Sequence, residues 1–436
     1  MTAKPDPFHP STKRYRFVVL AFASLVTYGS YFAYDSVGAI PDQLMRVWGV
    51  DQAAIGALYS LYSLAAVFTL LVGGIMIDRL GTRKSSLIFS LLVTGGASVV
   101  AFAPGIRTAY FGRFLFGAGS ESLITAQNAI IARWFKGKEL ALAFGVVLTI
   151  SRLGTLFSFN TEALIAGRYG PSAALWAAAF LCGLSVLANL GYNALDRRAG
   201  RTLGLVDGSS DRIVLADVQR FPKSFWYLTC LCTVFYSAIF PFTALSTDFF
   251  AQKYGLPNTT GEGLGFFQAV FYNFLHMFST APGTTSIIIF ASTLFAPFAG
   301  SMVDRLGKRA SLMLGGSFLM VLAYSILALT TLPPAVPMII LGAAFVIVPA
   351  AIWPSVPLIV EPQRTGTAYG LMTMIQNVGL MTFPWVNGRL RVRTQTYTAS
   401  MTMFAALGVI GIGLALALRR TDQKEGGVLE SRQAMS

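Results

Sequence analysis

Long apolar runs recur along the whole chain and limit its possible folds more than any motif does. The 436 residues are 54% hydrophobic and only 12% charged, which is about half the charged share of a soluble domain. Such a chain cannot cover a water-facing surface, which excludes a soluble enzyme, a secreted disulfide scaffold and a disordered protein. At about 20 apolar residues per membrane helix, the sequence predicts an all-α membrane protein with twelve transmembrane helices, near 17–40, 53–77, 86–104, 108–132, 139–165, 172–195, 224–250, 284–303, 310–330, 336–358, 366–386 and 398–418.

The longest polar segment between spans, residues 196–223, divides the chain into six spans and six. Most of the 33 Lys and Arg fall on the same side as the N-terminus, so the positive-inside rule predicts that both termini are cytoplasmic. The same clustering explains the net charge of +14 without a nucleic-acid partner. The predicted parts are an N-terminal tail 1–16, a six-helix bundle 17–195, a cytoplasmic loop 196–223, a second six-helix bundle 224–418 with an inserted non-cytoplasmic loop 257–283, and a tail 419–436.

The inserted loop 257–283 has a helical pattern of its own. From Gly261 to Thr280, large apolar side chains such as Phe267, Phe271 and Phe274 recur at helical spacing. This pattern predicts an amphipathic helix that lies in the membrane interface on the non-cytoplasmic face.

The sequence contains no motif for a metal or a nucleotide. Cys182, Cys230 and Cys232 lie inside apolar stretches, and the last two face different sides of a helix, so neither a metal site nor a disulfide is predicted. There is also no G-x-x-x-x-G-K-[ST] loop for ATP. We therefore expect a protein that is not an enzyme and that needs no cofactor.

A charged loop with the pattern G-x-x-x-D-R-x-G-x-R occurs twice, at 74–83 and again at 300–309. Two six-span halves with parallel repeats are the pattern of major facilitator transporters. The loop resembles the signature loop of that superfamily, and residues 113–119 resemble its second motif. The charges are predicted to latch one conformation, although the loops can also be plain positive-inside loops and Arg113 can simply cap its helix. The latch candidates are Asp78, Arg79, Arg83, Arg113, Asp304 and Arg305.

Glu121 and Arg152 are the charges that matter most, because each lies within an apolar run. An ionised side chain at the membrane centre costs about 2.5–3.5 kcal/mol on insertion scales, and such residues are candidates for functional sites. Counted from the turn near Gly137, both lie at a similar depth, roughly 20 Å at about 1.5 Å per residue. Either the two form a structural ion pair, or they provide one anionic and one cationic pole for a ligand.

Two opposite poles imply a zwitterionic ligand. An extended dipeptide separates its ammonium and carboxylate by roughly 7 Å, at about 3.3–3.6 Å per residue. Glu121 would bind the amino group, and Arg152 would bind the carboxylate through two parallel hydrogen bonds. The second half offers the neutral candidates Tyr236, Trp353 and Asn377 for substrate binding, which can equally be core residues at helix contacts.

Asp35 and Asp248 lie near the outer ends of the first and seventh spans. In these positions they can serve as outer gate residues. They can also be ordinary charges of the membrane interface, and the sequence leaves both interpretations open.

Longer motifs than the superfamily signature occur at 29–35, 112–122, 126–128, 134–140, 151–154, 240–242, 353–354, 366–370 and 376–377. These stretches resemble the lysosomal dipeptide uniporter family (major facilitator superfamily domain-containing protein 1-like). The resemblance implies the major facilitator fold with pseudo-symmetric 6+6 halves, dipeptide export without obligatory proton coupling, and Glu121 and Arg152 as the poles for the peptide termini. It also implies a lysosomal membrane location, or the plasma or inner membrane if the source lacks lysosomes, and a glycosylated single-pass accessory subunit.

The sequence therefore leaves three functions to compare. The first is a carrier that lies in the lipid bilayer and moves dipeptides by alternating access as a uniporter. The second is a proton-coupled symporter of organic anions or monocarboxylates, in which Arg152 binds the carboxylate and Glu121 carries the proton. The third is a receptor or scaffold that transports nothing.

Overall fold

The computed structural model describes residues 9–135, 139–203, 215–261, 263–361 and 364–431, and in these ranges it contains helices and no strand. The helices are α1 (Lys13–Leu25), α2 (Tyr28–Ala39), α3 (Pro41–Trp48), α4 (Gln52–Phe102), α5 (Ile106–Phe135), α6 (Leu140–Tyr169), α7 (Pro171–Leu203), η1 (Leu215–Arg220), α8 (Lys223–Thr243), α9 (Ser246–Tyr254), α10 (Phe266–Leu275), η2 (Met277–Ser279), α11 (Ala281–Leu306), α12 (Arg309–Leu329), α13 (Ala335–Ile352), η3 (Trp353–Ser355), α14 (Val356–Ile359), α15 (Thr365–Thr394) and α16 (Thr398–Lys424).

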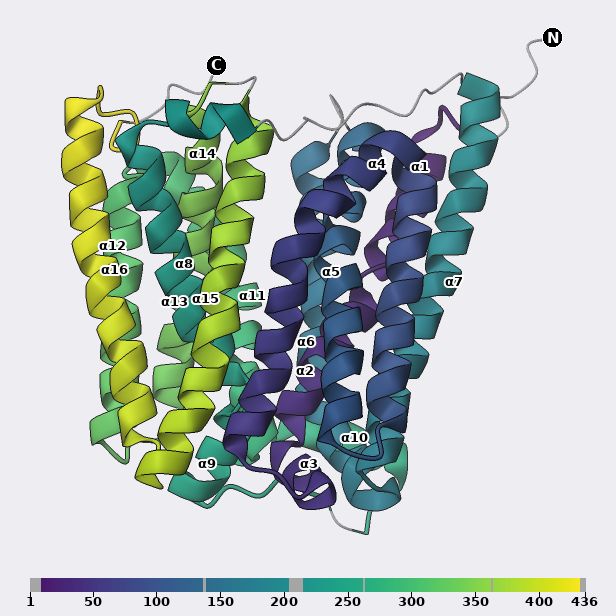
Figure 1. Cartoon of the computed structure of the whole chain (residues 1–436), viewed down its shortest axis with the longest axis vertical. Helices are drawn as coiled ribbons and strands as arrows, with labels where there is room; N and C mark the ends of the chain where they lie inside the picture. Colours follow the sequence, from purple (N-terminus) through teal and green to yellow (C-terminus); the bar gives the residue numbers. More distant parts are fainter. Residues whose placement is uncertain (1–8, 136–138, 204–214, 262, 362–363, 432–436) are drawn as a thin grey trace.

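The helices form two bundles that stand side by side (Figure 1). Helices α1–α7 make the first half, and α8–α16 make the second, except that α10 packs against α6 of the first half. The first and last helices have their chain ends at one end of the molecule, which we call the terminal end. Helices α3, α9 and α10 lie at the opposite end, which we call the distal end.

Helix α4 is two rods rather than one. A straight helix of its 51 residues would be about 77 Å long at about 1.5 Å per residue, more than twice the hydrocarbon thickness of about 30 Å. The chain reverses at Gly81, whose φ of 77° and ψ of 164° suit glycine and strain other residues. The second and third predicted spans are therefore the two arms of α4, joined by the first copy of the repeated loop.

Among the described residues, nine helical segments are long and apolar enough to cross a membrane. Helix α4 counts once among them although it holds two predicted spans, and α5 and α15 are not included. An all-α membrane protein is therefore confirmed, while the count of twelve spans stays a prediction. The first and seventh predicted spans are each broken, into α1 and α2 and into α8 and α9.

Three predicted boundaries shift in the structure. Helix α7 continues to Leu203, so the loop predicted to begin at residue 196 begins later. Helix α16 extends to Lys424, and the tail beyond it folds back, where the Glu430 carboxylate accepts hydrogen bonds from the backbone N–H and hydroxyl of Ser311 at 2.8 Å each. The amphipathic helix predicted over Gly261–Thr280 is present as the shorter α10, followed by η2.

Small residues let the two halves touch at the distal end. A Cβ added to Gly56 of α4 would lie 2.2 Å from the carbonyl oxygen of Pro384 on α15, and one added to Gly388 would lie 2.4 Å from that of Gln52. Such close backbone approach requires glycine. The halves are therefore closed against each other at the distal end.

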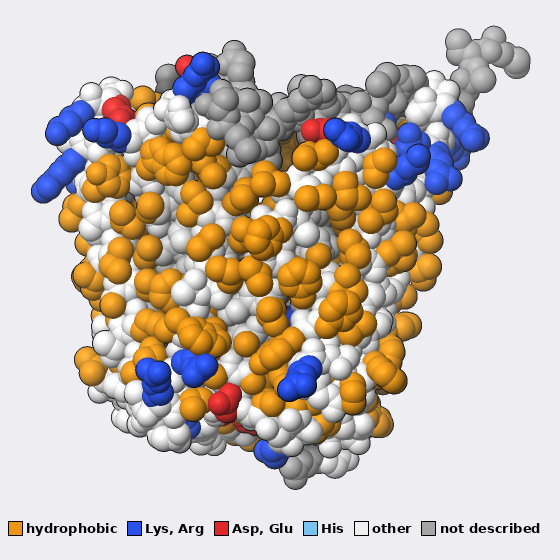
Figure 2. Space-filling view, viewed as in Figure 1, with side chains coloured by type: hydrophobic (Ala, Val, Ile, Leu, Met, Phe, Trp, Pro, Cys, Tyr) orange, Lys and Arg blue, Asp and Glu red, His pale blue; other side chains and the backbone are white. Residues whose placement is uncertain are grey.

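The surface fits a protein surrounded by lipid. Figure 2 shows a wide belt of hydrophobic side chains around the middle of one face, with basic side chains gathered mainly at the rim of the terminal end. Exposed apolar side chains such as Phe68, Phe180 and Phe298 are 64%, 65% and 70% accessible. In water this belt would be an aggregation surface, whereas in a bilayer it is solvated by lipid.

Candidate substrate site between the halves

Glu121 lies near the middle of α5, half-buried. Its carboxylate accepts a hydrogen bond of 2.8 Å from the hydroxyl of Tyr62 on α4. The ring of Tyr62 is held in turn by an edge contact with Tyr34 of α2, at a centroid distance of 4.8 Å. The anionic pole therefore has a fixed orientation inside the first half.

Arg152 lies on α6, and its contacts come from the other half. Its guanidinium donates a hydrogen bond of 3.1 Å to the hydroxyl of Ser292 on α11 and lies 5.0 Å from the ring centroid of Phe345 on α13. Both partners are neutral, so the positive charge is held by a dipole and an aromatic face. Arg152 thus points into the interface between the halves.

The two poles do not neutralise each other. Glu121 bonds Tyr62, Arg152 bonds Ser292, and within the described part of the chain no salt bridge joins the two side chains. Tyr31 of α2 lies within electrostatic range of both charges. The structural ion pair considered from the sequence is therefore absent in this conformation.

The second half contributes an aromatic cluster beside Arg152. Tyr236 of α8 lies within electrostatic range of Arg152, and its hydroxyl accepts a hydrogen bond of 3.0 Å from the indole N–H of Trp353. The Tyr236 ring also stacks on Phe240 at 5.8 Å. Asn377, by contrast, is 2% exposed and donates to the carbonyl of Thr373 on its own helix.

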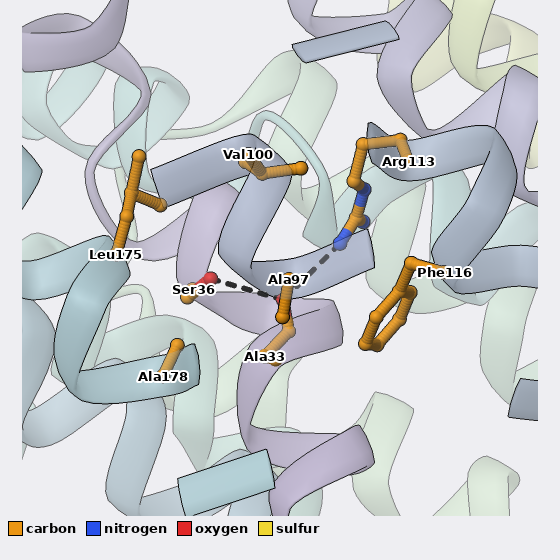
Figure 3. A pocket seen from close by; sticks show the side chains of 8 residues that line it. All are labelled: Ala33, Ser36, Ala97, Val100, Arg113, Phe116, Leu175 and Ala178. Carbon is orange, nitrogen blue, oxygen red and sulfur yellow. Dashed lines mark hydrogen bonds between the residues drawn. The ribbon is translucent and has the colours of Figure 1, made fainter. Parts of the chain in front are cut away.

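Arg113 binds within the first half, at the positions shown in Figure 3. Its guanidinium donates to the carbonyl oxygens of Ala33 at 3.1 Å and Tyr34 at 3.0 Å, and the Ser36 hydroxyl shares the Ala33 carbonyl. The Tyr59 ring centroid lies 4.8 Å from it. The adjacent cavity of about 10 Å³ is at the lower limit for one water molecule, so Arg113 holds α2 against α5 and does not line a substrate space.

The first repeated loop takes part in a charge cluster at the terminal end. Asp196 of α7 is completely buried and contacts Arg83 at 3.4 Å and Arg133 at 3.3 Å, and it accepts a hydrogen bond of 2.9 Å from the Trp134 indole. These partners all belong to the first half. Asp196 had been predicted to lie in the loop between the halves, and the continuation of α7 brings it into this cluster.

The structure describes some of the other latch candidates and not all of them. Arg79 of α4 and Arg305 of α11 are exposed near the terminal end, and Asp78 is half-buried. The side chain of Asp304 lies outside the described residues. The role of this set as a conformational latch stays a prediction.

Sequence reasoning missed several residues around the two poles. Nothing in the sequence distinguishes Tyr62, Ser292 and Phe345 from other residues of the apolar runs. Only the fold brings them next to Glu121 or Arg152. Glu162 of α6 was also missed, although it is an acid within a predicted span. It is fully buried, and neither carboxylate oxygen has a hydrogen-bond partner in the described part of the chain.

No candidate metal site accompanies the two charges in the described part of the chain. Among the described residues, no group of three or more His, Cys, Asp or Glu is placed to hold a metal ion. Glu121 and Arg152, opposite charges held by separate neutral partners, are thus the feature of the described residues that best suits a ligand.

Two helical bundles that stand side by side, with Arg152 of one half bonded to Ser292 of the other, form the architecture of a membrane carrier of the two-half type. The family model of the Major Facilitator Superfamily matches residues 20–288 and 278–434. The chain therefore belongs to the Major Facilitator Superfamily, and it is a transporter-type membrane protein rather than an enzyme.

Curated relatives match over nearly the whole length. The chain is similar to the lysosomal dipeptide transporter MFSD1 of Danio rerio, with 32% identity over 96% of this chain and 90% of the relative. The human lysosomal dipeptide transporter MFSD1 is also 32% identical, over 98% of this chain and 90% of the relative.

Solved structures share the fold. The peptide transporter PepTSo of the POT family covers 95% of this chain and 99% of its own, with a TM-score of 0.73 and 14% identity. The nucleoside transporter NupG, as a D323A mutant, covers 92% of this chain and 99% of its own, with a TM-score of 0.71 and 16% identity. At such low identities the likeness supports the fold alone.

Proposed function

We propose that this protein carries dipeptides across a membrane by alternating access, as a uniporter. The observation that carries the proposal is the pair of opposite charges, Glu121 and Arg152, which are bound by separate neutral partners and not by each other. The curated relatives that match nearly the whole chain are dipeptide transporters, which supports the same substrate class.

In this proposal each pole binds one end of the peptide. Glu121 accepts hydrogen bonds from the α-amino group, and Arg152 binds the α-carboxylate with its planar fork. Tyr31 and Tyr236 lie near the poles and would contact the peptide backbone or side chains. Because these walls are aromatic rather than charged, the site would accept many side chains.

Arg152 also suggests how binding is linked to movement. It belongs to the first half but bonds Ser292 of the second, so a peptide carboxylate that takes over its N–H groups would change a contact between the halves. The closed distal end would then have to part for exchange on that side. The repeated loops at the terminal end would serve as the latch of the opposite state, with both termini in the cytoplasm.

The membrane in question would be that of the lysosome, as the names of the relatives indicate. An accessory subunit, implied by the family resemblance, would contact the distal end. There α10 exposes Phe267, Phe271 and Leu275 by 85%, 66% and 63% along one face. Equal amounts of folded transporter with and without a co-expressed accessory subunit would count against such a partner.

The proposal is tested by uptake of a labelled dipeptide into proteoliposomes held at equal pH on both sides. Saturable uptake is expected, with competition by unlabelled dipeptides and weak competition by N-acetylated or C-amidated ones. Equal competition by the N-acetylated peptide would contradict the role of Glu121. Uptake that requires an imposed proton gradient and is not competed by neutral dipeptides would instead favour the symporter of organic anions. A receptor or scaffold predicts no saturable flux.

A further inference from the structure

A group of polar side chains from both halves meets at the distal end around Asp248 of α9. This carboxyl is 2% exposed. It accepts hydrogen bonds from Gln52 of α4 at 3.3 Å, from Gln252 at 2.6 Å and from the hydroxyl of Tyr397 at the start of α16. Gln52 belongs to the first half and the other three residues to the second, so the contacts around Asp248 join the halves.

A second carboxyl completes the group. Asp42 at the start of α3, in the first half, faces this group, because α3 packs against α9 and the side chain of Asp42 interacts with the carboxyl of Asp248. An ionised carboxylate only accepts hydrogen bonds, so two facing carboxyls can bond only when one of them carries a proton. Because Gln52, Gln252 and Tyr397 all donate to Asp248, Asp42 is the partner that holds the proton.

The other charged groups near this pair are few. Arg46 lies on α3 itself, and Arg391 of α15 lies over the Tyr397 ring at 5.1 Å and donates to Gln252. Lys253 of α9 turns away to the carbonyl of Leu327. Asp51, the N-cap of α4, is exposed and bonds the N–H of Ala54.

We propose that Asp42 and Asp248 form a proton-dependent latch between the halves at the distal end. With one shared proton the carboxyls bond each other and keep this end closed. Without it, two carboxylates face each other across the interface and repel, which favours opening. The proton arrives from the distal side and returns to it, so the latch regulates the conformation without carrying protons across the membrane.

The direction of the pH effect follows from the pKa of Asp42. Burial, the hydrogen bond to Asp248 and its negative charge raise this pKa to about 7, against the opposing charge of Arg46. An aspartate freed by opening has an ordinary pKa of about 3.9. The closed state is therefore favoured at acidic pH, and between these two values the ratio of closed to open molecules falls by about tenfold per pH unit.

The test measures the distance across the distal end. Spin labels are placed by Val47→Cys on α3 and Thr396→Cys before α16, both at exposed positions, with the exposed native thiol removed by Cys230→Ser. Pulsed electron paramagnetic resonance of the purified protein without substrate then gives the distribution of distances between the two spin labels at pH 5 and pH 8. This distance is measured without any substrate. A negative result would therefore refute the latch and would leave the proposed dipeptide transport untouched.

The short-distance population is expected to dominate at pH 5 and to fall at pH 8. Asp42→Asn should keep the short distance at both pH values, because its amide donates to Asp248 without titrating, and Asp248→Asn provides a second variant of the same kind. Asp51→Asn removes one acid at the same end and keeps the cap, so it should respond as the wild type does. A wild-type distribution that ignores pH, or an Asp42→Asn distribution that follows pH as the wild type does, would overturn the latch.

Discussion

The substitution Glu121→Gln separates the charge of the anionic pole from its shape. The Tyr62 hydroxyl that donates to the carboxylate at 2.8 Å can donate to the amide oxygen as well, so the side chain keeps its position. What is lost is the charge that meets the peptide ammonium. A hydrogen bond to a charged group contributes about 1.5–3 kcal/mol, and the dissociation constant of a free dipeptide should rise by about 10- to 150-fold.

The assay is a titration of purified protein with one dipeptide in its free and N-acetylated forms. The N-acetylated form lacks the ammonium, so its affinity should be weak for the wild type and should not weaken further in Glu121→Gln. The matched control is Glu162→Gln, because this acid is buried in α6 and its oxygens have no partner in the described part of the chain. An equal loss of affinity for both ligands would refute the reasoning, since it would indicate general damage to the site.

Three further substitutions test the supports of the fold. Gly81→Ala should lower the free energy of unfolding by about 1–3 kcal/mol, seen as a lower Tm, because the turn of α4 has a φ of 77°. Asp196→Asn should cost about 1.5–3 kcal/mol, because it removes the charge that Arg83 contacts at 3.4 Å; an unchanged Tm would contradict this. The hydrogen bond and charge of Lys13 lower the pKa of Glu139, so the stabilisation is present above the ordinary pKa of about 4.3 and is lost as pH falls through the lowered value. The difference in Tm between wild type and Glu139→Gln should therefore shrink from pH 6 to pH 3.

The sequence predicts the rods of this fold well because each apolar run must match the membrane thickness. It also predicts a change of direction near Gly81, since the repeated loop 74–83 falls between the second and third predicted spans. It does not predict the breaks between α1 and α2 or between α8 and α9, because the apolar runs continue across them. Hydropathy measures the length of a run and is insensitive to a local change of direction.

The two charged residues of the site could be predicted from the sequence, whereas the residues that contact them could not. Glu121 and Arg152 stand out because isolated charges in apolar runs are rare. Their partners Tyr62 and Ser292 are 59 and 140 positions away, and no periodic pattern links residues so far apart. Asp42 lies just beyond the first predicted span, where an acid looks like ordinary interfacial charge until the fold brings it to Asp248.

The central claim is that one peptide bridges two poles that do not pair with each other. The most direct measurement is an electron cryo-microscopy structure of the protein with a bound dipeptide. We expect the peptide ammonium beside Glu121 and the carboxylate on the guanidinium of Arg152. A peptide bound elsewhere, with Glu121 and Arg152 joined in a salt bridge, would contradict the account.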